Sequence, residues 1–112
     1  MSALPRFGHA ERSARISRPS VYGVVRDEEG RVAIVEAPDG VFLPGGGIEA
    51  GESPEQALIR EAVEECGWAV AVGAQLGQAI QYTAEFEKQC WFFALTIRKV
   101  VGAPSEPGHR PL

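Results

Sequence analysis

Glu61, Glu64 and Glu65 are the side chains of this chain best placed to do chemistry together. Their spacings of three and four residues put them on one side of an α-helix, with neighbouring Cβ atoms about 5–6 Å apart. Carboxylate oxygens suit a hard cation such as Mg²⁺, which also keeps waters and binds substrate phosphates. The spacing therefore indicates a possible divalent metal site.

A solvated acidic helix face is the alternative interpretation of these three glutamates. Exposed like-charge pairs at such spacings cost only about 0.2–0.5 kcal/mol each, so repulsion alone does not require a metal. Arg60 is the nearest cation in the sequence. The carboxylates taken by themselves leave both interpretations open.

Three glycines, Gly45 to Gly47, stand shortly before the acidic residues. Glycine leaves backbone N–H and C=O groups unshielded, so a phosphate or a metal ion can approach closely. For a glycine cluster alone, a tight turn between a strand and a helix is the simpler explanation. Its fixed distance from the acidic residues favours a functional site.

The helix that carries the glutamates is predicted to run from Pro54 to Cys66. Ser53 is a suitable N-cap, Pro54 suits the first helical position, and Gln56 completes a capping box. Gly67 is the expected stop. The apolar side of this helix consists of Leu58, Ile59, Ala62, Val63 and Cys66.

The segment from Gly46 to Trp68 resembles the Nudix box. All fixed positions of that motif are present, namely Gly46, Glu52, Arg60, Glu61, Glu64, Glu65 and Gly67. Two softer positions differ, because Ala62 is smaller and Trp68 bulkier than the aliphatic residue usual there. Neither position carries a ligand in the family, so the differences concern packing more than chemistry.

The resemblance implies an α/β (α+β) fold, a Nudix-like α/β/α sandwich with a mixed β-sheet. It implies a hydrolase that cleaves the diphosphate linkage of a nucleoside diphosphate linked to another group, with Mg²⁺ or Mn²⁺ as cofactor. The substrate would be a small-molecule nucleotide. A nucleotide-binding regulatory module with little or no turnover is the first alternative, and an interaction protein with a solvated acidic helix is the second.

Roles for individual residues follow from the same resemblance. Glu61, Glu64 and Glu65 would hold the metal, with a carbonyl of the Gly45-Gly46 turn as a further ligand. Glu52 and Arg60 would pair and orient Glu61 or its neighbour. The general base would be Glu61 or Glu65, or a carboxylate outside the motif. The outside candidates are Glu85, Glu87 and Glu106, for each of which a solvent-facing position is the simpler expectation.

Substrate contacts are expected from Gly46, Gly47, Tyr82 and Phe86. Aromatic side chains can stack a nucleobase, with about 1–3 kcal/mol per base. Trp91 is a further candidate, but packing in the core is the simpler role for Trp91 and the two phenylalanines after it.

The length and composition of the chain are typical of one globular domain. The 112 residues are 45% hydrophobic and 23% charged, and the net charge of -4 argues against duplex nucleic acid as a partner. No apolar run is long enough for a membrane span or a secretion signal, so a cytoplasmic protein is expected. Cys66 and Cys90 are expected to be buried thiols in a reducing compartment.

The chain divides into a basic, flexible arm over residues 1–17 and a Nudix-like domain over residues 18–112. The arginines of the N-terminal segment, with Arg18 as the last of them, could contact phosphates, but a frayed arm is the simpler expectation. Within the domain, strands are expected at residues 21–25, 31–37, 41–43, 69–72, 75–82 and 90–101. The first two should form a hairpin around the turn at residues 27–30. Gly73 and Gly77 should cause a bulge or break.

The end of the chain departs from the family pattern. A second helix usually covers the other sheet face, but residues 102–112 form a proline-rich segment, so the domain is expected to be C-terminally truncated or covered by another element. An uncovered apolar sheet face would favour association. A homodimer or higher oligomer is therefore predicted.

Overall fold

The computed structural model describes residues 5–7, 16–103, 105 and 110–111 of the chain. Within them it has a mixed α+β fold with one helix, α1 (Pro54–Cys66). The strands in chain order are β1 (Arg6–Phe7), β2 (Ile16–Ser17), β3 (Ser20–Val24), β4 (Val35–Ala37), β5 (Gly40–Phe42), β6 (Gly45–Gly47), β7 (Trp68–Tyr82), β8 (Phe86–Val100) and β9 (Arg110–Pro111).

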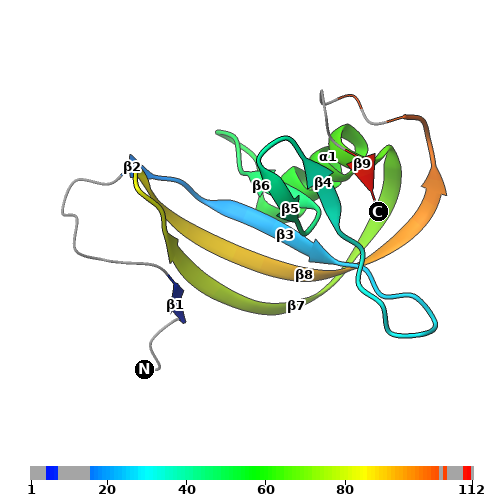
Figure 1. The fold of residues 1–112 in the computed structure, drawn as a ribbon, viewed down its shortest axis with the longest axis horizontal. Coiled ribbons are helices and arrows are strands. Elements are labelled where there is room, and N and C mark those ends of the chain that lie inside the picture. Colours follow the sequence, from blue (N-terminus) through cyan, green and yellow to red (C-terminus); the bar gives the residue numbers. More distant parts are fainter. Residues whose placement is uncertain (1–4, 8–15, 104, 106–109, 112) are drawn as a thin grey trace.

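A mixed six-stranded sheet forms the body of the molecule. Its strands lie in the order β1-β7-β8-β3-β6, and β2 also pairs with β8. The antiparallel β7 and β8 are long, curved strands that cross the whole molecule (Figure 1). β3 runs parallel to β8 and antiparallel to β6. A smaller antiparallel sheet has the order β5-β4-β9.

The predicted helix is confirmed at both ends. Ser53 accepts a hydrogen bond from the backbone N–H of Gln56 at 3.1 Å, and the Gln56 side chain accepts one from the Ser53 N–H at 2.9 Å. Gly67 ends the helix with φ of 70°, a left-handed conformation that glycine adopts without strain. These local signals fix which residues the helix presents to the sheet.

Only part of the predicted apolar side of α1 packs on the main sheet, because Ile59 and Val63 are exposed. Leu58 and Ala62 are fully buried there, against Val21 of β3 and Phe93 and Leu95 of β8. Full burial of a leucine side chain stabilises a fold by about 1.5–3 kcal/mol relative to exposure. This packing fixes the rotation of the helix and hence the direction of its polar side.

The predicted hairpin of residues 21–25 and 31–37 is correct only near its turn. Arg26 and Val32 form an isolated antiparallel bridge around the turn. The later part of the segment, β4, pairs instead with β5 and β9 in the small sheet. The reason is that β3 already has β8 on one edge and β6 on the other.

Two other strand expectations also change. The segments predicted at residues 69–72 and 75–82 form one continuous strand, β7, whose register shifts near Gly73 and Gly77 as the bulge prediction requires. The glycines predicted as a turn, Gly45–Gly47, form the edge strand β6 opposite Tyr22, Val21 and Ser20 of β3. Their backbone groups therefore belong to a sheet edge.

No second helix occurs among the described residues, so α1 covers one face of the sheet. On the opposite face, the half-buried rings of Tyr22 and Phe92 stack with centroids 5.8 Å apart.

No helix in the described part of the chain is long and apolar enough to cross a bilayer. Most of the predicted basic arm, and also Glu106, lies outside the described residues.

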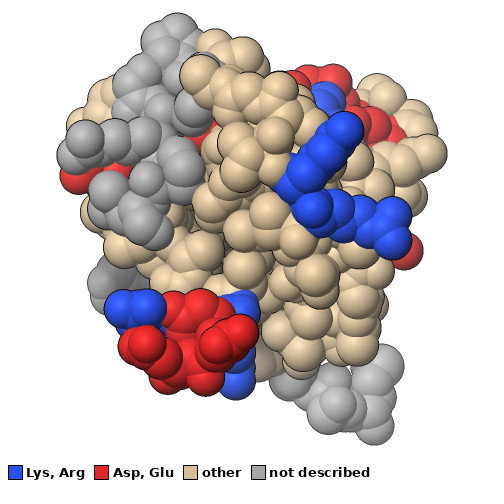
Figure 2. Space-filling model, turned by 90° about the vertical axis from the view of Figure 1, so that its right-hand side faces the viewer, with Lys and Arg blue, Asp and Glu red and all other residues tan. Residues whose placement is uncertain are grey.

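Further apolar surface lies where β8 ends and the turn at residues 27–30 projects. Figure 2 shows this end as mainly uncharged, with the charged side chains in separate groups. A hollow of about 760 Å³ there is lined by residues that include Val25, Val32, Trp68, Leu95 and Ile97. The predicted oligomer remains a prediction.

Candidate active site

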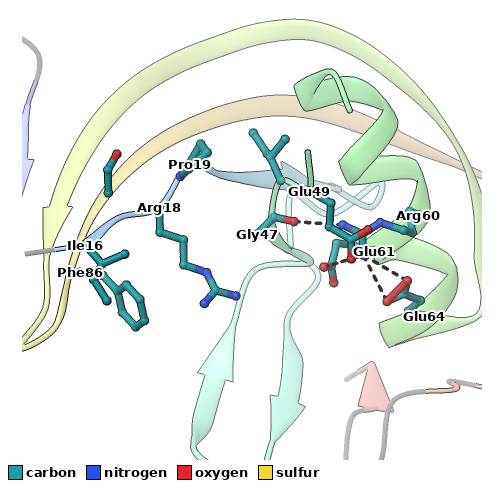
Figure 3. A pocket seen from close by; sticks show the side chains of 11 residues that line it. Ile16, Arg18, Pro19, Gly47, Glu49, Arg60, Glu61, Glu64 and Phe86 are labelled. Carbon is teal, nitrogen blue, oxygen red and sulfur yellow. Dashed lines mark hydrogen bonds and ion pairs between the residues drawn. The ribbon is translucent and has the colours of Figure 1, made fainter. Parts of the chain in front are cut away.

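Arg60 is the centre of the polar network on α1. Its Nε and Nη2 donate to the two carboxylate oxygens of Glu52 at 2.8 and 2.9 Å. Its Nη1 donates to Glu61 and to Glu64, each at 3.1 Å, and its Nη2 also donates to the carbonyl oxygen of Gly47 at 3.0 Å. One guanidinium thus joins the loop before the helix, the acidic side of the helix and strand β6 (Figure 3). The predicted pairing of Glu52 with Arg60 is confirmed.

These bonds change the acid–base properties of the pair. The Arg60 guanidinium holds the pKa of the Glu52 carboxyl at about 2, below its ordinary 4.5. The bonds to Glu52 in turn raise the pKa of Arg60, against the smaller opposing effect of its burial. The Glu52 carboxylate and the Arg60 guanidinium therefore both carry their charges at neutral pH.

Glu65 turns away from Arg60 towards strand β6. Its Oε1 accepts a hydrogen bond from the backbone N–H of Gly45 at 2.8 Å. Glu61 lies against the next residue of the strand, because a Cβ atom on Gly46 would be 2.9 Å from the Glu61 carboxylate carbon. Glycine at position 46 lets the Glu61 carboxylate approach the strand, whereas glycine at position 45 leaves room for the backbone of β3.

The residues of this site fit a hard divalent cation by their chemistry. Glu61 and Glu65 are only 7% and 6% exposed, and a buried carboxylate needs compensating charge or hydrogen bonds. Oxygen donors of this kind are those that Mg²⁺ and Mn²⁺ prefer. The described carboxylates do not converge as a ready-made group of metal ligands, because Glu61 and Glu64 are bound to Arg60. A metal ion would therefore compete with Arg60 for these oxygens.

Two adjoining hollows form a cleft beside this network. The first, of about 470 Å³, contains Arg60, Glu61 and Glu64 in its wall, and the second, of about 300 Å³, contains Glu61 and Glu65. Both are lined by Arg18, Gly47, Glu61 and Phe86. The cleft is wide enough for a small molecule beside the acidic side of α1.

The structure brings together most of the residues predicted for the site. Phe86 and the three glycines of β6 line the cleft, together with all three glutamates. Tyr82, Glu85 and Glu87 are not among the lining residues. The backbone carbonyls of Glu85 and Glu87 instead accept hydrogen bonds from the N–H groups of Ile16 and Arg18.

Several lining residues were not found from the sequence. They are Ser20, Tyr22, Asp39, Phe42 and Lys88, while Arg18 was considered only as part of the basic N-terminal segment. Arg18 reaches the cleft because β2, just before it, pairs in parallel with β8 about 70 residues away in the chain. Local sequence carries no signal for such a pairing.

The two cysteines play no part in this network. Both are buried free thiols, as expected. Burial, with a smaller effect of the neighbouring Glu65 charge, raises the pKa of Cys66 to about 12, and burial also raises the pKa of Cys90. Such thiols are poor nucleophiles near neutral pH, because the thiolate is the reactive form.

Comparison with known proteins agrees with this geometry. A model of the NUDIX domain matches residues 16–110. An 8-oxo-dGTP diphosphatase of Haemophilus influenzae is 35% identical over 88 residues, which make up 73% of this chain and 63% of that protein. An RNA pyrophosphohydrolase of Halorhodospira halophila is 44% identical over 62 residues, 54% of this chain and 34% of that protein.

The fold has solved counterparts. The crystal structure of a MutT protein from Methanosarcina mazei superposes with a TM-score of 0.72 at 25% identity, over 82% of this chain and 72% of that chain. The chain spans less than two thirds of the length of the curated relatives named above. The match therefore covers the domain with the acidic helix, and each relative has further sequence outside it.

Proposed function

Because this chain belongs to the Nudix family, we propose that it is a metal-dependent pyrophosphohydrolase that cleaves the phosphoanhydride linkage of a small nucleotide. The observation that carries the proposal is the position of Arg60, which binds Glu52, Glu61 and Glu64 at the wall of an open cleft. A network of this kind places several carboxylates at one surface. A merely solvated acidic helix would not need it.

Each residue has a role in this proposal. Glu61, Glu64 and Glu65 would hold Mg²⁺ or Mn²⁺, with a carbonyl of Gly45 as an additional donor. The bound ion would neutralise the diphosphate and lower the pKa of a coordinated water. Glu52 and Arg60 would keep Glu61 and Glu64 in position. The backbone of Gly46 and Gly47 and the ring of Phe86 would contact the substrate.

The general base must lie within hydrogen-bond reach of the attacking water. Glu61 and Glu65 satisfy the requirement of lining the cleft, and Asp39 is a lining carboxylate outside the motif. Glu85 and Glu87 do not line it. The base is accordingly proposed to be Glu61 or Glu65 of the motif, with Asp39 as the candidate outside it.

A substrate panel tests the function directly. The protein is incubated with Mg²⁺ or with Mn²⁺ and with nucleoside triphosphates, ADP-ribose, nucleotide sugars and dinucleoside polyphosphates. Turnover that disappears on chelation supports the enzyme. Saturable binding without turnover would support the regulatory module instead, and neither binding nor turnover would leave the acidic helix as a solvated surface.

A cytoplasmic homodimer completes the proposal. The buried free cysteines fit a reducing compartment, and the exposed apolar side chains Val32, Ile97, Val100 and Val101 fit an association surface. A net charge of -4 agrees with a small-molecule substrate and not with duplex nucleic acid. Light scattering at micromolar concentration that gives a monodisperse monomer would refute the dimer.

A further inference from the structure

The cleft also contains a positive charge that the roles above do not use. Arg18 lines both hollows, and its side chain extends between Phe86 and the acidic side of α1 (Figure 3). Its backbone is held in place, since the Arg18 N–H donates to the carbonyl of Glu87 at 2.8 Å. The hydrogen bond to β8 therefore fixes the backbone of Arg18 beside the cleft.

The guanidinium of Arg18 has two neighbours that orient it. Its central carbon lies 5.2 Å from the centroid of the Phe86 ring, a cation–π arrangement. On the other side, a Cβ atom on Gly47 would be 3.2 Å from Nε and Nη2. The guanidinium thus lies between an aromatic ring and the bare backbone of β6, next to the residue whose carbonyl binds Arg60.

Arg18 itself supplies a charge that suits an anionic ligand, although carboxylates that include Glu61 and Glu65 line the same cleft. Among the described residues, the cations in ion pairs are Arg31 and Arg60. Lys88 of β8 adds a second positive charge to the same cleft. A planar guanidinium matches the oxygens of a phosphate, with two parallel N–H donors.

We propose that Arg18 binds an ionised phosphate of the substrate, on the side of the cleft away from α1, and so selects nucleotides that end in a polyphosphate. The inference rests on the proposed function, in which the glutamates bind the diphosphate through a metal. A nucleoside triphosphate offers Arg18 a terminal phosphate with about 1.5–2 negative charges near neutral pH. A diphosphate linked to a sugar offers an uncharged group there.

The first test compares two substrates in three variants. Arg18→Gln is expected to lower kcat/KM for a nucleoside triphosphate roughly 10- to 100-fold, mainly through KM, and to change that for ADP-ribose less than about threefold. Arg18→Lys keeps the charge but loses the two parallel donors. Its kcat/KM for the triphosphate should lie between those of wild type and Arg18→Gln. Arg98→Gln, which removes the same charge from an exposed position on β8, is the matched control and should match wild type. Equal losses for both substrates, or no loss, would overturn the proposal.

A second test separates this inference from the proposed function. Affinity for a non-hydrolysable methylene triphosphate is measured by calorimetry with Mg²⁺ present, so the test needs no turnover. Wild type should bind more tightly than Arg18→Gln, even if no substrate in the panel is cleaved. Equal affinities would overturn the role of Arg18 and leave the hydrolase proposal untouched.

The part played by Phe86 is tested by a double-mutant cycle. Phe86→Leu keeps an apolar side chain but removes the aromatic face, so it should weaken triphosphate binding about two- to fivefold when Arg18 is present. In the Arg18→Gln background, the same change should have no further effect. A loss of equal size in both backgrounds would show that Phe86 acts independently of Arg18, contrary to the proposed orientation.

Discussion

Arg60 and Glu52 face each other across two parallel hydrogen bonds, Nε to Oε2 at 2.8 Å and Nη2 to Oε1 at 2.9 Å. This bidentate pair leaves Nη1 of the same guanidinium for Glu61 and Glu64. Glu52 therefore sets the orientation of Arg60, and Arg60 sets that of the two glutamates. The position of the candidate metal ligands depends on a residue in the loop before the helix.

Arg60→Lys tests this dependence. An ammonium group retains the charge but cannot make the two parallel bonds to Glu52 while also reaching Glu61 and Glu64. We expect kcat/KM for a cleaved nucleotide to fall at least about tenfold, with the fold retained in circular dichroism. Arg31→Lys is the control, because Arg31 pairs with Asp27 on the exposed surface. Similar activities of the two variants would contradict the orienting role.

The pKa of Glu52 predicts a specific dependence of stability on pH. This pKa is about 2 in the folded protein and ordinarily 4.5, so the charged carboxylate favours folding. Its contribution is fully present above about pH 4.5 and is lost as the pH falls towards about 2. Urea unfolding of wild type and Glu52→Gln should give a difference in unfolding free energy that is constant near neutral pH and shrinks below pH 4.5. A difference that does not change down to the lowest pH would refute the assignment.

Gly46→Ala probes the contact between β6 and Glu61. The new Cβ atom would lie 2.9 Å from the carboxylate carbon and Oε1 of Glu61, so this buried side chain must move and strain its bond to Arg60. We expect a loss of activity of about tenfold or more with a smaller effect on stability. Gly77→Ala is the matched control, because a Cβ atom there meets nothing within 4 Å. Equal activity in the two variants would show that the close approach is not needed.

The sequence was most informative where structure depends on neighbours in the chain. Ser53, Gln56 and Gly67 define the ends of α1 through capping and backbone conformation, which are local effects. The spacing of the glutamates then follows from the helix period. The helix and its acidic side were therefore predictable to the residue.

Long-range pairing was not predictable in this way. The partners of β3 are β6 and β8, and the sequence near residues 21–37 cannot show that β8 competes successfully with a local hairpin. The same limit applies to Arg18, whose place at the cleft depends on the pairing of β2 with β8. The acidic side of the cleft was therefore predicted from the sequence, and its basic side was identified in the structure.

Glu65→Gln gives a test of metal binding that leaves the local structure in place. The Gln side-chain oxygen can still accept the hydrogen bond that Gly45 donates to Glu65 at 2.8 Å, so strand β6 should keep its position. The negative charge is lost, and Mn²⁺ affinity measured by electron paramagnetic resonance should fall about tenfold or more. Glu55→Gln removes a charge from an exposed position in the first turn of the same helix and should bind Mn²⁺ as wild type does. If the two variants bind Mn²⁺ equally well, Glu65 is not a ligand, and the buried carboxylate serves only to hold β6 against the helix.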